Sequence, residues 1–224
     1  MDSQIMTFQL KIYVLHVACL LSLMFICDIQ AEEQNQPSES SRISNFVLRD
    51  QTGKTRSLYS EKTKASVVVF MGTECPLAKL YAQRLQEMAS STAYQNVNFY
   101  GIMSNQHDSD EDIVEYARQH EISFPLLKDL HNRVADQFAA ERTPEAFLLD
   151  DEYRIRYRGR IDDQFGIGTL LKEPRSHDLK NALDELLAGK NITFPVTNAV
   201  GCIIGREPKM KPTQKITFSR DIIR

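Results

Sequence analysis

The chain has 224 residues, which is enough for one domain with a complete hydrophobic core and additional tails. Its formal net charge of −3 is close to balanced, which excludes the strongly basic surface that proteins use to bind nucleic acid. The sequence contains four cysteines and no tryptophan.

Residues 1–31 predict an export signal. Lys11 precedes an apolar run over residues 12–26, and polar residues follow from Asp28 onward. The run of about 15 residues is shorter than the roughly 20 that a membrane-spanning helix needs. Ala31 has the small side chain that suits a cleavage site. We therefore expect a periplasmic or secreted protein, with an uncleaved N-terminal anchor as the alternative.

The composition divides the rest of the chain into three parts. Residues 32–42 are polar and rich in serine, which predicts a linker, and residues 43–190 predict the folded domain. Residues 191–224 form a tail with scattered prolines that carries Cys202. Cys19 and Cys27 lie in the export signal, so only Cys75 and Cys202 remain after its removal. In an oxidising compartment two cysteines can form one disulfide.

The domain begins with a predicted β-hairpin, since Asp50 and Gly53 mark a turn between two short strands. A β-branched run over residues 66–71 then predicts a buried strand. Apolar residues at helical spacing follow it and predict a helix to about residue 90: Leu77, Leu80, Tyr81, Leu85 and Met88.

Cys75 lies at the junction between this strand and this helix. Gly72 and Thr73 break the strand, and Pro76 suits the first turn of a helix because its missing N–H has no partner there. Such a position favours a thiolate over a thiol, since the helix dipole and the unpaired N–H groups stabilise negative charge. Lys79 adds to this effect and Glu74 opposes it. We interpret Cys75 as a reactive thiol, with a buried structural cysteine as the alternative.

The next strand brings polar residues toward this cysteine. Residues 97–103 predict a strand parallel to the first, because a helix connects the two. Both strands then end at the same sheet edge, where ligands bind in open α/β sheets. Asn105 and Gln106 are therefore candidates for hydrogen-bonding a thiolate or a substrate. His107 is a candidate acid or base, with a solvated loop as the alternative.

A Thr143–Pro144 step leads into the apolar strand at residues 146–149. Residues 154–160 alternate between aromatic or aliphatic residues and arginine, which predicts an antiparallel partner strand with one solvated face. Residues 179–187 carry leucines at helical spacing and predict a closing helix that ends before Gly189.

This order of elements resembles the thioredoxin-like redoxins. It is most similar to their alkyl hydroperoxide reductase/thiol-specific antioxidant branch and to the TlpA-like exported thioredoxins of cytochrome maturation, over about residues 43–190. The resemblance implies an α/β thioredoxin fold, with a central mixed sheet flanked by helices and an N-terminal β-hairpin extension. It also implies a cis peptide at Thr143–Pro144 facing Cys75, and no cofactor or metal.

The resemblance implies thiol chemistry, and the residues leave three forms of it open. Thiol–disulfide exchange needs a second thiol to release the mixed disulfide. The Cys-x-x-Cys motif is absent, because Ala78 stands at its second cysteine, and Cys202 is the remaining resolving candidate. This main hypothesis is an exported oxidoreductase with Cys75 as nucleophile. Its partners are a protein thiol or disulfide, an external thiol donor, and a fused or separate redox domain.

The second form is a peroxiredoxin-like peroxidase with antioxidant activity, which needs a threonine and an arginine to hold the peroxide. Thr73 lies one position closer to the cysteine than in peroxiredoxins, and Arg142 or Arg160 is the candidate arginine. The third form is a redox-inactive docking module, in which a Cys75–Cys202 bond is a structural link.

Overall fold

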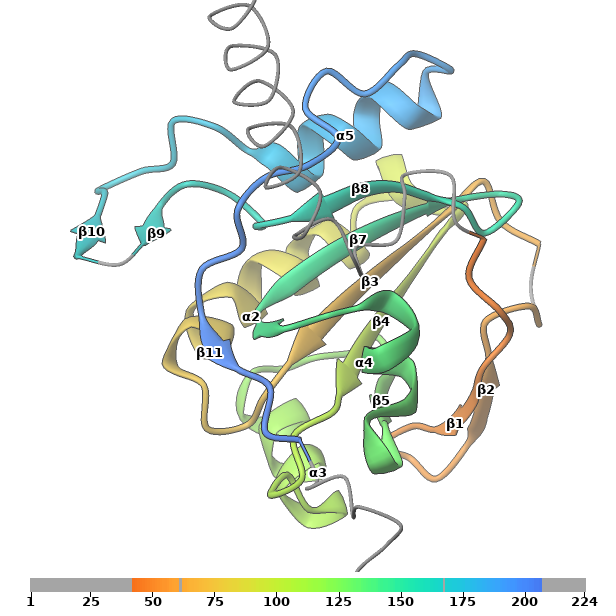
Figure 1. Ribbon diagram of the computed structural model, residues 1–224, viewed down its shortest axis with the longest axis vertical. Helices are drawn as coiled ribbons and strands as arrows, with labels where there is room; N and C mark the ends of the chain where they lie inside the picture. The colour runs from red at the N-terminus through yellow and green to blue at the C-terminus, as the bar shows by residue number, and fades with distance from the viewer. Residues whose placement is uncertain (1–41, 61, 167, 207–224) are drawn as a thin grey trace, which may run out of the picture. The chain divides into compact units, whose positions relative to one another are not determined.

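The computed structural model describes residues 42–60, 62–166 and 168–206 (Figure 1). The predicted export signal, most of the linker and residues 207–224 lie outside the described residues. Within the described part of the chain, none of the helices is long and apolar enough to cross a membrane.

The centre of the domain is a five-stranded mixed sheet with the strand order β5-β4-β3-β7-β8. Its strands are β3 (Ala65–Met71), β4 (Val97–Met103), β5 (Leu126–Lys128), β7 (Glu145–Asp150) and β8 (Ile155–Gly159). The strands β3, β4 and β5 are parallel, whereas β7 and β8 run antiparallel to their neighbours. The parallel pairing of β3 with β4, predicted from the helix between them, is confirmed.

Helices cover both faces of the sheet. They are α2 (Pro76–Ala89), α3 (Asp110–Gln119), α4 (Arg133–Phe138) and α5 (Asp178–Leu187), with short 3-10 turns at η1 (Thr92–Tyr94) and η2 (Leu130–Asn132). Alternate residues of β3 point to opposite faces: Val67 and Val69 pack with α2, α3 and α5, and Val68 and Phe70 pack with α4. All seven residues of β3 are buried for this reason.

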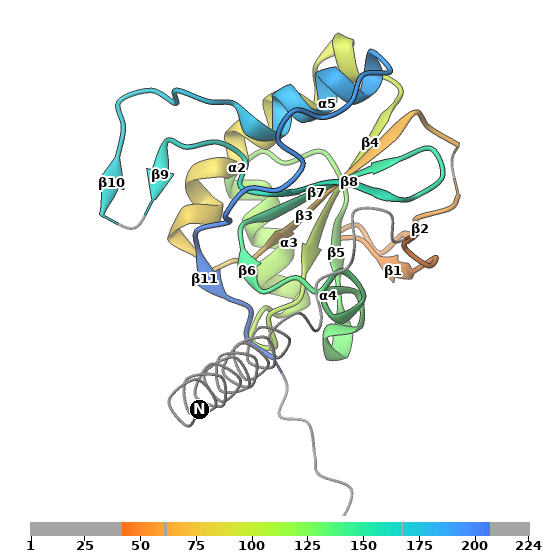
Figure 2. The ribbon, with the colours of Figure 1, turned by 45° about the horizontal axis from the view of Figure 1, so that its top comes forward.

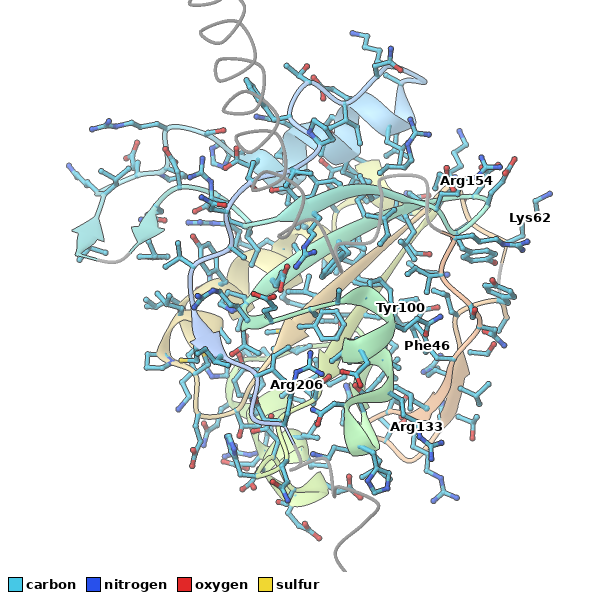
Figure 3. The ribbon with its side chains drawn as sticks, in the orientation of Figure 1. Phe46, Lys62, Tyr100, Arg133, Arg154 and Arg206 are labelled. Atoms are coloured by element: carbon cyan, nitrogen blue, oxygen red, sulfur yellow. The ribbon has the colours of Figure 1, made fainter. Side chains whose placement is uncertain are left out.

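The predicted N-terminal hairpin is present as β1 (Val47–Arg49) and β2 (Thr55–Ser57). Its turn is closed by a hydrogen bond from the Gly53 N–H to the Asp50 carbonyl, and Gly53 has the positive φ that favours glycine. Phe46, just before β1, packs edge-on against Tyr100 of β4 (Figure 3). The hairpin therefore belongs to the same core as α4.

Two further pairs of short strands lie beside the central sheet in the described part of the chain: β6 (Arg142–Thr143), β9 (Phe165–Gly166), β10 (Thr169–Leu170) and β11 (Cys202–Ile203). β9 pairs with β10, and β11 pairs with β6 in an antiparallel ladder. β11 and β6 lie side by side in Figure 2, although they are far apart in the sequence.

β11 belongs to a segment, residues 195–206, that we call the strap because it crosses the domain from β8 to the loop before α3 (Figure 1). At its first end, the Thr197 N–H donates to the Arg158 carbonyl at 2.9 Å. At its other end, Ile204 is buried in the core beside α4, and Arg206 pairs with Asp136 of that helix (Figure 3). The strap is thus held at both ends, with Cys202 between them.

Candidate active site

Cys75 is the N-cap residue of α2, directly after the turn that ends β3. Its backbone is extended, with φ −73° and ψ 115°, and Pro76 begins the helix as predicted. The turn is closed by a hydrogen bond from the Cys75 N–H to the Gly72 carbonyl at 3.2 Å. A side chain at Gly72 would collide with the Asn105 side-chain amide, which would have to shift, so the two loops approach closely at this glycine. The sequence therefore places this sulfur at the mouth of a helix.

The Thr143–Pro144 peptide is cis and lies beside Cys75, as the resemblance implied. The Cys75 thiol donates a hydrogen bond to the Thr143 carbonyl at 2.9 Å. Only 4% of Cys75 is exposed, which is the burial that the alternative of a structural cysteine implied. The strap from the tail pairs with Thr143 directly beside this thiol, an arrangement that the sequence analysis did not predict.

Cys202 occupies the position directly opposite Thr143 in the β6–β11 ladder. The preceding residue permits this approach, because a side chain at Gly201 would collide with the Thr143 carbonyl. Cys202 is exposed, and in the described part of the chain both it and Cys75 are free thiols. The two thiols are close enough for each to shift the pKa of the other. The structure thus brings the two candidate cysteines together without a bond between them.

The groups around the two thiols shift their pKa values in opposite directions. Burial raises the pKa of Cys75, but hydrogen bonds from the Thr143 side chain, the Ala78 backbone and Cys202 lower that pKa below its ordinary value. The pKa of Cys202 is raised, first by its hydrogen bond to Cys75 and then by burial. Of the two thiols, Cys75 therefore gives up its proton more readily.

Replacing Cys202 tests this assignment. Cys202→Ala removes the S–H donor, so we expect the pKa of Cys75 to rise, and its alkylation by iodoacetamide to need a higher pH. Cys202→Ser keeps a hydroxyl donor and is the matched control, for which we expect a smaller shift. Alkylation rates of Cys75 measured by peptide mapping across a pH series give both values. Equal midpoints for the wild type and Cys202→Ala would contradict the assignment.

Three residues predicted to touch the thiolate or substrate instead hold the strap. The Asn105 side chain accepts from the Gly205 N–H at 2.9 Å, and the Gln106 N–H donates to the Gly205 carbonyl at 3.0 Å. The Arg142 guanidinium donates to the Gly201 carbonyl at 3.1 Å. Asn105 does reach the turn before Cys75, where its side chain lies against Gly72, but the hydrogen bonds that these three residues form near the site are with the strap or with Asp108.

Asp108 is a site residue that sequence analysis missed. Its buried carboxylate accepts from the Thr73 hydroxyl at 2.6 Å, from the Thr73 N–H at 3.2 Å and from the Asn105 amide at 3.1 Å. It thereby joins the turn before Cys75 to the loop that holds the strap. The Thr73 hydroxyl, a predicted peroxide contact, is a donor to this carboxylate.

Two other predicted site residues have partners or positions away from the thiol. Arg160, a candidate for binding the peroxide, forms an ion pair with Asp178 at 2.7 Å. His107 is half exposed, with its ring 3.6 Å from Glu74.

Tyr116 is a second residue that sequence analysis missed. It is buried on α3, and its hydroxyl has no hydrogen-bond partner among the described residues. Burial raises the pKa of Tyr116, and the negative charges of Cys75 and Asp108 raise it further. Its hydroxyl therefore keeps its proton beside the thiolate.

Comparison with known proteins identifies the family. Residues 40–158 match the AhpC/TSA family model, which includes Cys75 and Thr143–Pro144 but ends before Cys202. The chain belongs to the AhpC/TSA family. It is therefore a redoxin of the thioredoxin-like type, and the fold predicted from the sequence is confirmed.

Individual relatives agree with this assignment. The thiol-disulfide oxidoreductase ResA of Bacillus subtilis is 26% identical over 53% of this chain, and the chain spans 65% of that protein. A hypothetical protein from Sinorhizobium meliloti is 30% identical, with a TM-score of 0.70 over 77% of this chain and 97% of its own. The thioredoxin domain of a Bacteroides vulgatus thiol-disulfide oxidoreductase shares the fold at 18% identity, with a TM-score of 0.52 over 67% of this chain and 98% of its own.

Proposed function

We propose that this AhpC/TSA protein is an exported thiol–disulfide oxidoreductase whose Cys75 and Cys202 alternate between a dithiol and a disulfide. The observation that carries the proposal is that both cysteines meet at Thr143: Cys202 lies opposite it in the β6–β11 ladder, and the Cys75 thiol donates to its carbonyl. A second thiol so placed can do what the second cysteine of a Cys-x-x-Cys motif does. The apolar run at residues 12–26 supports export.

The reaction needs only these two sulfur atoms and a thiol donor. The Cys75 thiolate attacks one sulfur of a substrate disulfide, which forms a mixed disulfide and releases the first substrate thiolate. Cys202 loses its proton and attacks the Cys75 sulfur, which forms the Cys75–Cys202 bond and releases the second thiolate. The substrate gains two electrons and the protein loses two. An external thiol donor then returns the protein to the dithiol.

The N-terminus of α2 supports two of these steps: the attack by the Cys75 thiolate on the substrate, and the final reduction, in which Cys75 is released as a thiolate. The N-terminal N–H groups of α2, that of Ala78 among them, stabilise negative charge on the Cys75 sulfur. The Thr143 hydroxyl is buried and has no other partner within the described residues, so it can donate to the sulfur once the thiol ionises. Both hydrogen-bond donors stabilise the Cys75 thiolate, whether it attacks the substrate or leaves when the disulfide is reduced.

Peroxide reduction is supported less well. The Thr73 hydroxyl donates to Asp108, Arg142 contacts the strap, and Arg160 pairs with Asp178. None of the residues predicted to hold a peroxide is thus oriented by its contacts toward the Cys75 sulfur. The redox-inactive module is supported less well still, because a low thiol pKa serves no purpose in a purely structural link.

Two cysteine variants test the proposal. We expect Cys75→Ser to abolish reduction of a protein disulfide, because no thiolate remains at the helix mouth. We expect Cys202→Ser to stop after one step and to accumulate a mixed disulfide on Cys75, visible by mass spectrometry. Turnover of insulin with dithiothreitol as donor measures the activity. Peroxide consumption by the wild type without disulfide reduction would favour the peroxidase, and inactivity in both assays would favour the docking module.

A further inference from the structure

We propose that the middle of the strap, residues 198–203, is a cover that must lift away from β6 before a protein disulfide can reach Cys75. The inference rests on the proposed function, because it concerns the substrate that Cys75 attacks. It adds to that function an autoinhibitory contact, which selects small disulfides over those carried by a protein and which sets the order of the two steps.

Cys75 is closed to a protein disulfide while the cover is in place. Only 4% of Cys75 is exposed, and its thiol donates to the Thr143 carbonyl. A side chain at Gly201 would collide with the same carbonyl oxygen, so the strap passes directly beside the atom that the thiol contacts. A new S–S bond is only about 2.05 Å long, so the attacked sulfur and the chain that carries it need space at the Cys75 sulfur. The first step therefore requires a movement.

The cover, rather than the elements beneath it, is the part that can move. β6 continues through Pro144 into β7, whose residues are all buried, and α2 packs into the same core. β11 lies at the surface beside β6 in both Figure 1 and Figure 2, with Cys202 exposed and Ile203 76% exposed. Segments with few buried apolar contacts are the ones that open locally at low free-energy cost.

Few hydrogen bonds hold the cover closed. Its ladder with β6 has two pairs of residues, Cys202 with Thr143 and Ile203 with Arg142. The Arg142 guanidinium adds one bond, to the Gly201 carbonyl at 3.1 Å. Within the described part of the chain, residues 198–200 form no hydrogen bond with the domain. Breaking the short ladder and the Arg142 bond is therefore enough to lift the cover.

The two ends of the strap are held more firmly than the cover. On one side, the Thr197 hydroxyl is 2.7 Å from the hydroxyl of the buried Tyr157. On the other side, Ile204 is 2% exposed, and Gly205 donates to the Asn105 side chain and accepts from the next residue, 106. The cover is thus a short loop fixed at both ends, which returns to the same place after it lifts.

The return of the cover links the two steps of the proposed reaction. While the cover is lifted, the Cys75 thiolate attacks the substrate disulfide, forms the mixed disulfide and releases one substrate thiolate. When the cover falls back toward β6, Cys202 meets the mixed disulfide, loses its proton and attacks the Cys75 sulfur, which releases the second substrate thiolate. A loosened cover should therefore speed the first step with a protein substrate and slow the second.

Two strap variants in the Cys202→Ser background test the first step. Arg142→Ala removes the bond to Gly201, and Gly201→Ala disturbs the ladder without changing a charge. Each protein is mixed with insulin or with the small disulfide 2,2′-dithiodipyridine, at a pH where the rate no longer rises. Acid-quenched samples are mapped for the mixed disulfide on Cys75. Because the rate with a large substrate follows the open population, we expect insulin to react about tenfold faster than with Cys202→Ser alone, and dithiodipyridine less than about threefold faster.

Arg118→Ala and Gly205→Ala in the same background are the controls. Arg118 forms an exposed ion pair with Glu115 on α3, and a methyl group at Gly205 would make ordinary contacts at the firmly held end of the strap. We expect both controls to keep the rates of Cys202→Ser with both disulfides. In the background that retains Cys202, Arg142→Ala should accumulate more mixed disulfide with insulin than the wild type does. Circular dichroism checks that the variants are folded.

The outcomes separate the inference from the proposed function. A gain that is confined to insulin supports both. Equal gains with insulin and dithiodipyridine, or no gain with either, overturn the inference and leave the proposed function in place. If Cys202→Ser forms no mixed disulfide on Cys75 with either reagent, the proposed function fails and the inference fails with it.

Discussion

Replacing Gly201 with alanine should detach β11 from β6 and slow formation of the Cys75–Cys202 disulfide by more than about tenfold. The added methyl group would collide with the Thr143 carbonyl, a backbone atom that cannot move aside as a flexible side chain can. Without the ladder, Cys202 is only tethered to the domain by the chain, so its effective concentration at the Cys75 sulfur falls. We also expect Cys75 to become more accessible to large maleimides.

Gly205→Ala is the matched control for this prediction. Gly205 lies on the same strap, but a methyl group there would meet the His107 ring at 3.4 Å and the Asn105 amide oxygen at 3.8 Å, which are ordinary contacts with side chains. Oxidation by a small disulfide, followed over time by peptide mapping, measures the rate for both variants. If Gly201→Ala and Gly205→Ala form the disulfide at the same rate, the β6–β11 ladder does not position Cys202.

Replacing Glu145 with alanine should reduce the free energy of unfolding by about 3–5 kcal/mol, because it leaves a mostly buried guanidinium without its counter-ion. Glu145 and Arg158 form an ion pair at 2.8 Å, with side-chain exposures of 3% and 15%. The second carboxylate oxygen accepts from the Glu141 N–H at 2.8 Å and from the Arg142 N–H at 3.2 Å. The variant therefore also loses the contacts that shape β6, on which the strap pairs.

Urea unfolding of the wild type and Glu145→Ala measures this loss. Lys180→Ala is the control, because Lys180 forms an exposed pair with Asp184 on α5, and exposed pairs contribute little. We expect Glu145→Ala to lower the unfolding midpoint far more than Lys180→Ala. Similar midpoints for the two variants would show that the buried pair is replaceable and that β6 is held by other contacts.

The parts of the site that local sequence patterns encode were predictable. Cys75 and Pro76 are adjacent, and the β-branched run before them identifies β3. The Thr143–Pro144 step was likewise visible as the start of an apolar strand. Asn105 was correctly placed near Cys75, because parallel strands joined by a helix must end at one sheet edge.

The strap was not predictable in this way, because its contacts join residues far apart in the chain. Gly205 and Asn105, which share a hydrogen bond, are 100 positions apart. β11 has two residues and both are exposed, so it has no alternation of polar and apolar side chains by which a strand is recognised. Counting cysteines made Cys202 a candidate, but only the ladder to Thr143 explains why it meets Cys75.

Asp108 was missed for a related reason. An acidic residue in a loop is common, and only the approach of Thr73 and Asn105 distinguishes this one. Its partner Thr73 was assigned to peroxide binding because a hydroxyl near a reactive cysteine suits that role. The structure shows instead a hydroxyl committed to a buried carboxylate, which no spacing in the sequence indicates.

The location of Cys202 near the end of the described chain also has a consequence for thermal stability. In the proposed oxidised state, the bond to Cys75 would close a covalent ring that contains all the helices of the described residues and most of the central sheet. A ring of more than a hundred residues stabilises a folded protein by about 4–5 kcal/mol, since the unfolded chain loses conformational freedom. The melting temperature of this protein would then report its redox state, and reduction by a partner would leave a chain that unfolds more easily.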